Sequence, residues 1–267
     1  ITNYSQQTSE ITYVKGPPVA ITSGAGSVGI TLKQGYKIGQ FFGYRMMKSL
    51  DEINPQTGTA FIPADQRSLY EVVHTNVGGD WVVNKATKQA VALPGQYSLG
   101  DPNPKFNMSF INNLNYKNTV TFNLQWDWVS GAHLYNQTKQ WMYRDGIHHD
   151  YDNPITIDGQ TFAYTAFYRS MYAGGAANGT KNYFYEDASF VRLRNVSIGV
   201  DLAKIAKMKA FSRFQLVLSG RNLVTFTPYS GMDPEVNYST NSAFDRGLDH
   251  NTIPNTKQYT IGLNVGF

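Results

Sequence analysis

The sequence contains stretches of about ten residues in which apolar and polar side chains alternate strictly. The clearest runs from 257 to 267, where each odd position from Tyr259 to Phe267 is apolar and each even position between them is small or polar. A period of two residues is typical of a β-strand with one apolar and one polar face. About ten residues is also the length that a tilted strand needs to cross the hydrocarbon layer of a membrane.

The same alternation recurs in 119–128, where we expect Asn123 and Gln125 to face a polar lumen. Further strands are predicted at 106–116 and, less cleanly, at 214–222. In 190–200 the apolar positions change from odd to even, which predicts a β-bulge near Asn195. The side chains of 119–128 expected to face lipid are Val120, Phe122, Leu124, Trp126 and Trp128.

The predicted strands are joined by alternately short and long connections. Lys117-Asn118 and 201–210 are short, whereas 47–105, 131–185 and 224–254 are long. Outer-membrane barrels have short periplasmic turns and long extracellular loops. We therefore predict an all-β fold, an antiparallel transmembrane β-barrel. Two weaker strands are expected, around 37–46 and within the first fifteen residues.

Composition agrees with a membrane barrel and argues against other classes. Charged residues are only 16% of the chain, below the quarter typical of soluble domains. No window approaches the eighteen or so apolar residues of a membrane helix. The sequence has no cysteine, and its net charge of +4 is scattered, so we predict no thiolate metal site and no nucleic-acid partner.

Five motifs then appear in an order that resembles one known family. They are Gly39–Tyr44 (GQFFGY), Gly100–Phe106 (GDPNPKF), Tyr185–Val196 (YEDASFVRLRNV), Ser219–Leu223 (SGRNL) and Asp233–Glu235 (DPE). Together with the terminal strand they resemble the C-terminal barrel portion of SusC/RagA-family TonB-linked outer-membrane transporters. Because several motifs occur in series, chance agreement is a poor explanation.

The resemblance implies an architecture and a location. Residues 1–267 would be the C-terminal part of a barrel of roughly 22 strands in the bacterial outer membrane, with the plug domain and the N-terminal strands absent from this chain. Implied partners are a SusD-like surface lipoprotein, TonB-ExbB-ExbD acting through the missing N-terminal parts, outer-membrane lipid, and the barrel-assembly machinery. That machinery would read the last strand, including Tyr259 and Phe267.

The implied function is import of large nutrients, oligosaccharides or oligopeptides, without catalytic residues, metal or cofactors. One alternative is a SusC-like barrel that serves as a structural subunit of a larger outer-membrane complex. Sequence upstream of Ile1 would discriminate the two, since an importer needs a plug. A secreted carbohydrate-binding β-sandwich is a third interpretation, which detergent-dependent solubility would exclude.

The loop 131–185 holds the candidate ligand-binding residues. Aromatic rings flanked by hydrogen-bonding groups suit sugars or peptides, because ring faces stack on apolar surfaces. The alternative is that the loops of a barrel simply pack on one another. The candidates are Trp141, Tyr143, Asp145, His148 and Tyr151. The aromatic residues Tyr116, Trp126, Trp128, Phe211 and Tyr259 are expected instead at the membrane interfaces.

Two further patterns have ordinary explanations. The run Gly24–Gly29 is a GxGxxG, but the β-branched residues after it do not predict the helix that a dinucleotide site needs. Asp145 and Glu186 could pair as glycosidase carboxylates, but no motif of a catalytic triad accompanies them, and ordinary charged loop residues are the favoured explanation.

His148 and His149 are adjacent in sequence, and adjacent histidines point apart on most backbones, so we predict no metal site there. Calcium bound by Asp150, Asp152 and Asp158 stays open.

Overall fold

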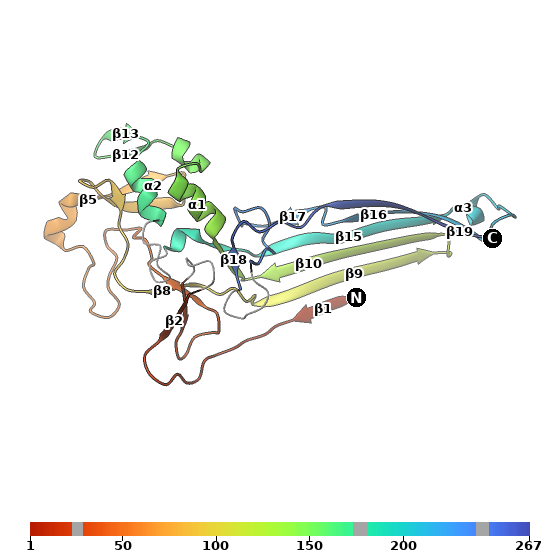
Figure 1. The fold of residues 1–267 in the computed structure, drawn as a ribbon, viewed down its shortest axis with the longest axis horizontal. Coiled ribbons are helices and arrows are strands. Elements are labelled where there is room, and N and C mark those ends of the chain that lie inside the picture. The colour runs from red at the N-terminus through yellow and green to blue at the C-terminus, as the bar shows by residue number, and fades with distance from the viewer. Residues whose placement is uncertain (23–28, 173–180, 239–245) are drawn as a thin grey trace.

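The computed structural model describes residues 1–22, 29–172, 181–238 and 246–267. Strands dominate, and the molecule is elongated. Long strands run side by side along one part of it, and short strands and helices gather at the other end (Figure 1). None of the helices in the described ranges is long and apolar enough to cross a membrane.

The long strands form one antiparallel sheet. Its order is β1-β9-β10-β15-β16-β19, and the short strand β17 also pairs with β15. The bounds are β1 (Thr2–Ser5), β9 (Phe106–Tyr116), β10 (Val120–Ser130), β15 (Phe190–Asp201), β16 (Arg213–Arg221), β17 (Thr225–Phe226) and β19 (Gln258–Gly266). Each strand predicted from alternation is confirmed to within two residues, and β1 confirms the strand expected near the N-terminus.

The short connections lie at one end of this sheet. Lys117 and Asn118 have φ of 51° and 53°, and the Thr119 N–H donates to the Tyr116 carbonyl at 2.9 Å. These values form the type of tight turn that matches strand twist in hairpins. The other short connection contains helix α3 (Leu202–Ile205), which lies at the same end as the C-terminus (Figure 1).

The two faces of the sheet differ as the alternation predicts. On one face Asn123 donates to the Ser197 hydroxyl at 2.9 Å. On the other, the rings of Phe106 and Trp128 lie 4.9 Å apart. The rings Tyr116, Phe211 and Phe267 lie toward the short-turn end, while Trp126, Trp128 and Tyr259 lie toward the loop end, as the strand registers require.

The predicted bulge is confirmed in β15. Gln125 pairs with Asn195, but Trp126 pairs with Leu193, so Arg194 is the extra residue. The bulge restores the phase: Leu193 before it and Val196 after it both lie on the apolar face. Without it, the second half of β15 would turn its apolar side chains toward the polar face.

The long connections fold together into a second unit, here called the loop body. Within the described residues it contains four small sheets, two helices and three 3₁₀ turns. The first connection contributes β2 (Val19–Thr22), β3 (Gly29–Leu32), β4 (Phe41–Gly43), η1 (Ala64–Leu69), β5 (Tyr70–Thr75), β6 (Gly79–Asn84), β7 (Gln89–Ala90) and β8 (Tyr97–Gly100). The later ones contribute β11 (His133–Asn136), α1 (Gln137–Asp145), η2 (His149–Asp152), β12 (Ile155–Ile157), β13 (Gln160–Phe162), α2 (Thr165–Tyr172), η3 (Asn182–Phe184), β14 (Tyr185–Asp187) and β18 (Leu248–Asp249).

One predicted strand belongs to the loop body instead of the barrel. Of the stretch 37–46, only β4 is a strand, and it lies in a four-stranded sheet with β2, β3 and β8. The reason is burial: Phe41 and Met46 are fully enclosed in the loop body's core. The first long connection therefore begins directly after β1 and runs to residue 105.

The loop body has its own hydrophobic core, which all three long connections supply. Trp81 comes from the first, Tyr143 and Phe167 from the second, and Leu248 from the third. Strand β18 of the third connection also pairs in parallel with β11 of the second. Contacts between segments distant in sequence thus hold the loops as one unit.

The main sheet does not close on itself. Among the described residues, β1 pairs only with β9, and β19 pairs only with β16. The two termini accordingly lie on opposite edges of the sheet in Figure 1. The structure confirms the prediction of antiparallel strands with long loops at one rim and short turns at the other, and the sheet that they form is open.

Candidate functional site

The candidate ligand-binding residues lie on two short elements of the loop body. Asn136 caps α1, because its side-chain oxygen accepts the Lys139 backbone N–H at 2.9 Å. Gly146, with φ of 70°, ends the helix in the left-handed conformation that glycine favours. This sharp end turns the chain from α1 into η2 and brings the two elements close together.

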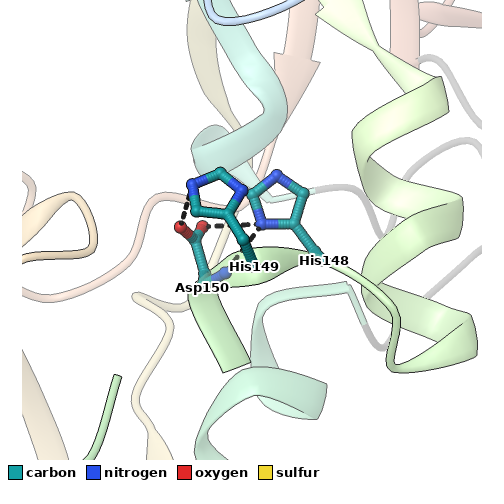
Figure 2. A group of neighbouring side chains, drawn as sticks. All are labelled: His148, His149 and Asp150. Carbon is teal, nitrogen blue, oxygen red and sulfur yellow. Dashed lines mark hydrogen bonds and ion pairs between the residues drawn. The ribbon is translucent and has the colours of Figure 1, made fainter. Parts of the chain in front are cut away.

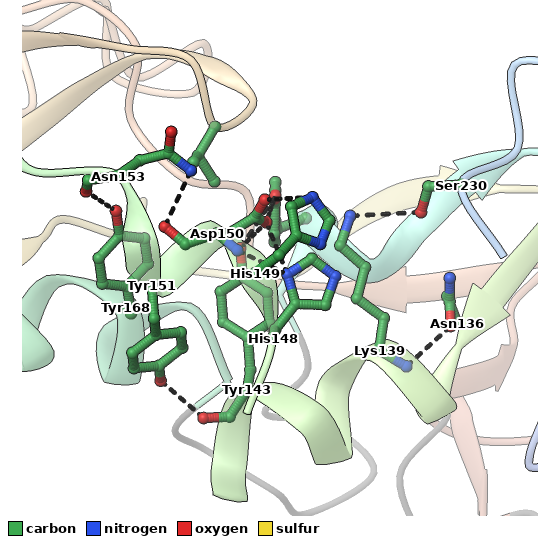
Figure 3. A network of polar contacts seen from close by, with 12 residues as sticks. Asn136, Lys139, Tyr143, His148, His149, Asp150, Tyr151, Asn153, Tyr168 and Ser230 are labelled. Atoms are coloured by element: carbon green, nitrogen blue, oxygen red, sulfur yellow. Dashed lines mark hydrogen bonds and ion pairs between the residues drawn. The ribbon is translucent and has the colours of Figure 1, made fainter. Parts of the chain in front are cut away.

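Tyr143 lies at the centre of a buried polar cluster (Figure 3). Its side chain is completely enclosed, and its hydroxyl donates to the Asp150 carboxylate and lies 3.0 Å from the Tyr183 hydroxyl. Tyr183 also donates to Asp150 at 2.9 Å. Burial, with Tyr183 and Asp150 nearby, raises the pKa of Tyr143 far above its ordinary value. Tyr143 therefore stays a neutral hydrogen-bond donor that holds Asp150.

His148 and Tyr151 join the same cluster. The rings of Tyr143 and His148 lie 5.0 Å apart, and those of Tyr143 and Tyr151 lie 5.6 Å apart. The Tyr151 hydroxyl donates to the Tyr143 carbonyl at 2.6 Å, and its ring stacks on Tyr168 at 4.6 Å. The structure thus brings three of the five candidates together, and their polar groups mainly bind one another.

The other two candidates, Trp141 and Asp145, lie elsewhere on α1. Trp141 packs its ring edge against His250 of the third connection, with centroids 4.5 Å apart. Asp145 is exposed and forms a 2.7 Å ion pair with the neighbouring Arg144. Glu186 instead pairs with Lys139 at 3.2 Å, so the two carboxylates of the suggested glycosidase pair are engaged with different cations.

Two adjacent imidazoles converge on one carboxylate (Figure 2). Nδ1 of His148 lies 3.1 Å from one oxygen of Asp150, and Nε2 of His149 lies 3.3 Å from the other. The two rings are 4.3 Å apart. The expectation that adjacent histidines point apart is therefore wrong here, because η2 turns both side chains to the same side.

The remaining patterns carry no site in the part of the chain that the structure describes. His148, His149 and Asp150 are the one group of three or more potential metal ligands found there, so Asp152 and Asp158 do not join Asp150 in a calcium cage. Most of the GxGxxG run lies outside the described residues. Its last glycine begins strand β3, where a dinucleotide fold would begin a helix.

A network of ion pairs joins the polar face of the sheet to the third connection. Arg192 is 2% exposed and binds Asp233 at 2.6 Å as well as Glu235. Arg194 binds Glu235 at 2.5 Å and Asp127 of β10 at 2.6 Å. Burial by itself would raise the pKa of Asp233, but hydrogen bonds from Arg192 and from backbone N–H groups hold it below its ordinary value. Every buried charge in the network thus has a partner.

Sequence reasoning identified the segments of this network but not its role. The arginines come from the motif Tyr185–Val196, and the carboxylates come from Asp233–Glu235. Asn222, from Ser219–Leu223, accepts a hydrogen bond from Arg194 at 3.2 Å. Three motifs far apart in sequence therefore meet in space. The sequence signal for this network was the presence of charged residues at alternate positions of an otherwise apolar strand.

A cavity of about 600 Å³ lies at the loop end of the polar face. Asn107 of β9, Val129 of β10 and Phe190 of β15 line it. In each strand the residue lies on the polar face of the sheet, the face that also carries Asn123. Residues of all three long connections complete the lining, including the charged groups Lys37, Asp101, Glu235 and Arg246. The cavity lining thus combines apolar groups with polar groups and charges of both signs, and the cavity lies between the sheet and the loop body.

Comparison with known proteins agrees with this architecture. The chain is 31% identical over 241 residues to TonB-dependent receptor P3 of Formosa agariphila, which covers 88% of this chain and 23% of the relative. TonB-dependent receptor P39 of the same organism is 24% identical over 273 residues, covering 90% of the chain and 26% of the relative. The chain belongs to the TonB-dependent receptor family. No family model matches it.

Solved structures show the same fold as this TonB-dependent receptor chain. The RagAB peptide importer in its closed-closed state matches with a TM-score of 0.58 at 16% identity, over all of this chain and 27% of the other. A structure of the RagAB peptide transporter gives 0.54 at 17% identity, over all of this chain and 26% of the other. The chain spans about a quarter of the curated relatives it matches. It is a segment of antiparallel barrel in the outer membrane, and the relatives carry names of receptors and importers, none of an enzyme.

Proposed function

We propose that the chain forms part of the wall and outer vestibule of a channel that imports large nutrients across the outer membrane. The observation that carries this proposal is the cavity between the polar face and the loop body. It offers hydrogen-bonding and charged groups of both signs, which suits polar cargo such as an oligopeptide or oligosaccharide. Ligand sites of this kind combine a concave shape with a few placed polar groups.

The solved structures with this fold support import and are compatible with a peptide as cargo, since they are structures of a peptide importer. The rest of the machinery belongs to the same proposal. The unpaired edges of β1 and β19 would be closed by further strands, because unpaired backbone groups cost several kcal/mol each in hydrocarbon. A plug domain would couple to TonB-ExbB-ExbD, and a SusD-like surface lipoprotein would cover the loop body.

Within the vestibule, the candidates of the second connection take different roles. Trp141 and Asp145 present surface to solvent or cargo. Tyr143 acts from inside by fixing Asp150, and His148 and Tyr151 flank it. The proposal assigns cargo contact to the accessible residues of this group and positioning to the buried one.

Uptake by cells that produce the full-length protein tests the proposal. Fluorescent oligopeptides and oligosaccharides of matched size are supplied separately, with a deletion strain as the reference. One class should accumulate in a TonB-dependent manner, and Arg246→Glu at the cavity lining should reduce that accumulation while surface levels stay normal. Equal accumulation of both classes with and without the protein would refute import.

Assembly is a separate part of the proposal. Phe267 follows β19, is 92% exposed and touches Phe211 with ring centroids 5.5 Å apart. We propose that the barrel-assembly machinery reads this strand through Tyr259 and Phe267. Deleting Phe267 should lower the amount of barrel in the membrane far more than deleting the exposed loop residue Ile53. Equal surface levels of the two deletion variants would contradict it.

A further inference from the structure

The cluster of His148, His149 and Asp150 is a built set of ligands outside the cavity and outside the barrel wall. One atom from each residue can be chosen so that all three lie within 4.8 Å of one another. Two imidazole nitrogens and one carboxylate oxygen form a set that suits borderline divalent transition cations such as Zn²⁺. We propose that this cluster binds one such cation on the loop body.

The distances are close to those of a coordinated ion. Two ligands bound tetrahedrally to zinc, each at about 2.0–2.1 Å, lie roughly 3.3 Å apart. The separation is 3.1 Å from His148 Nδ1 to Asp150 Oδ2 and 3.3 Å from His149 Nε2 to Asp150 Oδ1, so the two imidazoles face different carboxylate oxygens. A cation on Oδ1 is thus at ligand spacing from His149. The His148 ring, whose Nδ1 accepts the Asp150 backbone N–H at 3.2 Å, must turn to reach the same cation.

Burial divides the ligands into an inner and an outer set. The side chains of His148 and Asp150 are 10% and 12% exposed, while that of His149 is 79% exposed. The inner pair is held by the protein, and the outer imidazole lies on the solvent side and has room to rotate onto an arriving ion. With three protein ligands, a tetrahedral ion keeps one position for water or another donor.

A second layer of hydrogen bonds fixes the carboxylate. Tyr143 and Tyr183 both donate their hydroxyl hydrogens to the same oxygen of Asp150, which leaves the other oxygen to a cation. Such partners orient metal ligands, and their loss typically weakens metal binding about 10- to 100-fold. Tyr143 comes from α1 and Tyr183 from η3, so an ion bound through Asp150 would also stabilise the contact between these elements.

The rival explanation is a carboxylate that merely pairs with two imidazoles and takes no metal. Titration of the intact protein in detergent with zinc chloride, followed by calorimetry, separates the two. Wild type should bind one Zn²⁺, and His149→Ala should bind it at least about tenfold more weakly. His74→Ala is the matched control, because His74 is likewise exposed and pairs with one carboxylate, Asp80, at 2.7 Å. It should bind as wild type does.

A spectroscopic measurement tests the ligand set itself. With Cu²⁺ as the probe, electron paramagnetic resonance should show coupling to two imidazole nitrogens in wild type and to one in His149→Ala. Tyr183→Phe, which keeps the ring and removes the hydroxyl, should weaken zinc binding about tenfold with the nitrogen count unchanged. Wild type without saturable binding, or His149→Ala that binds zinc as tightly as wild type, would overturn the proposal.

Discussion

The sheet and the loop body use apolar residues in opposite ways. On the outer face of the sheet, Leu114 is 61% exposed and Ile261 is 77% exposed. In the loop body, Trp81 is 1% exposed and Tyr143 is completely buried. The difference follows from the solvent: the sheet leaves its apolar face open for lipid, whereas the loop body must cover its apolar side chains against water. One chain is therefore adapted to lipid in the sheet and to water in the loop body.

The two regions meet at the ion-pair network of Arg192 and Arg194. These arginines belong to a membrane-crossing strand, and their partners Asp233 and Glu235 belong to the third connection. The junction thus contains a set of buried, paired charges. The comparison predicts that similar substitutions will have different effects in the two regions.

The largest contrast is expected when tryptophan is truncated in each region. Trp81 packs against Phe167 and Tyr183, and its indole N–H donates to the Val77 carbonyl at 2.6 Å. Trp81→Ala should lower the free energy of unfolding of the loop body by about 3–5 kcal/mol. Trp126→Ala on the outer face should cost less, because lipid or detergent fills the space. Limited proteolysis and thermal unfolding measure both, and equal losses would contradict the assignment of faces.

Charge placed on neighbouring strand positions should give the next largest effect. Leu124→Arg puts a cation into hydrocarbon and should cost about 2–4 kcal/mol if the residue lies near the bilayer midplane. Gln125→Arg is the matched control, since that side chain faces the polar lumen and hydrogen-bonds Asp127 at 2.9 Å. Folding titrations into lipid vesicles measure the difference. A greater cost for Gln125→Arg would reverse the faces.

The smallest effect is a sensitivity of the loop body to alkaline pH. Burial raises the pKa of Tyr151 and of Tyr168 from 10.0 to about 12. Between these values the folded state binds more protons than the unfolded state, so the free energy of unfolding falls as the pH rises. We expect protease sensitivity of the loop body to rise from pH 10 to 12 while the sheet stays intact. Tyr151→Phe should reduce this dependence, and an unchanged slope would count against it.

The barrel strands could be predicted from sequence because their signal is local. A period of two over ten residues fixes the faces, and the slip at Asn195 located the bulge. The loop body could not be predicted in the same way. Its strands are two to six residues long, and its core joins Trp81, Phe167 and Leu248 from three separate connections. No periodicity in one segment reports contacts of that kind.

The candidate site was predicted only in part, because its geometry also depends on contacts between separate segments. The residue types around Tyr143 were recognised as a polar aromatic cluster, but burial and partner choice depend on how η2 folds back on α1. The convergence of His148 and His149 depends on the turn of a single short element. Arg192 and its partners were recognised only as motifs, because their pairing spans about 40 residues of sequence.

Accessibility of alternate positions along β10 tests the central claim most directly. This segment has no cysteine, so single cysteines at Phe122, Asn123, Leu124 and Gln125 can carry nitroxide spin labels in the intact protein in lipid, with any cysteine outside the segment replaced by serine. Oxygen dissolved in lipid should increase the spin relaxation rate of labels at Phe122 and Leu124. A water-soluble nickel chelate should increase that of labels at Asn123 and Gln125. Oxygen-accessible labels at Asn123 and Gln125, or no alternation along the strand, would contradict a membrane-spanning sheet with a polar lumenal face.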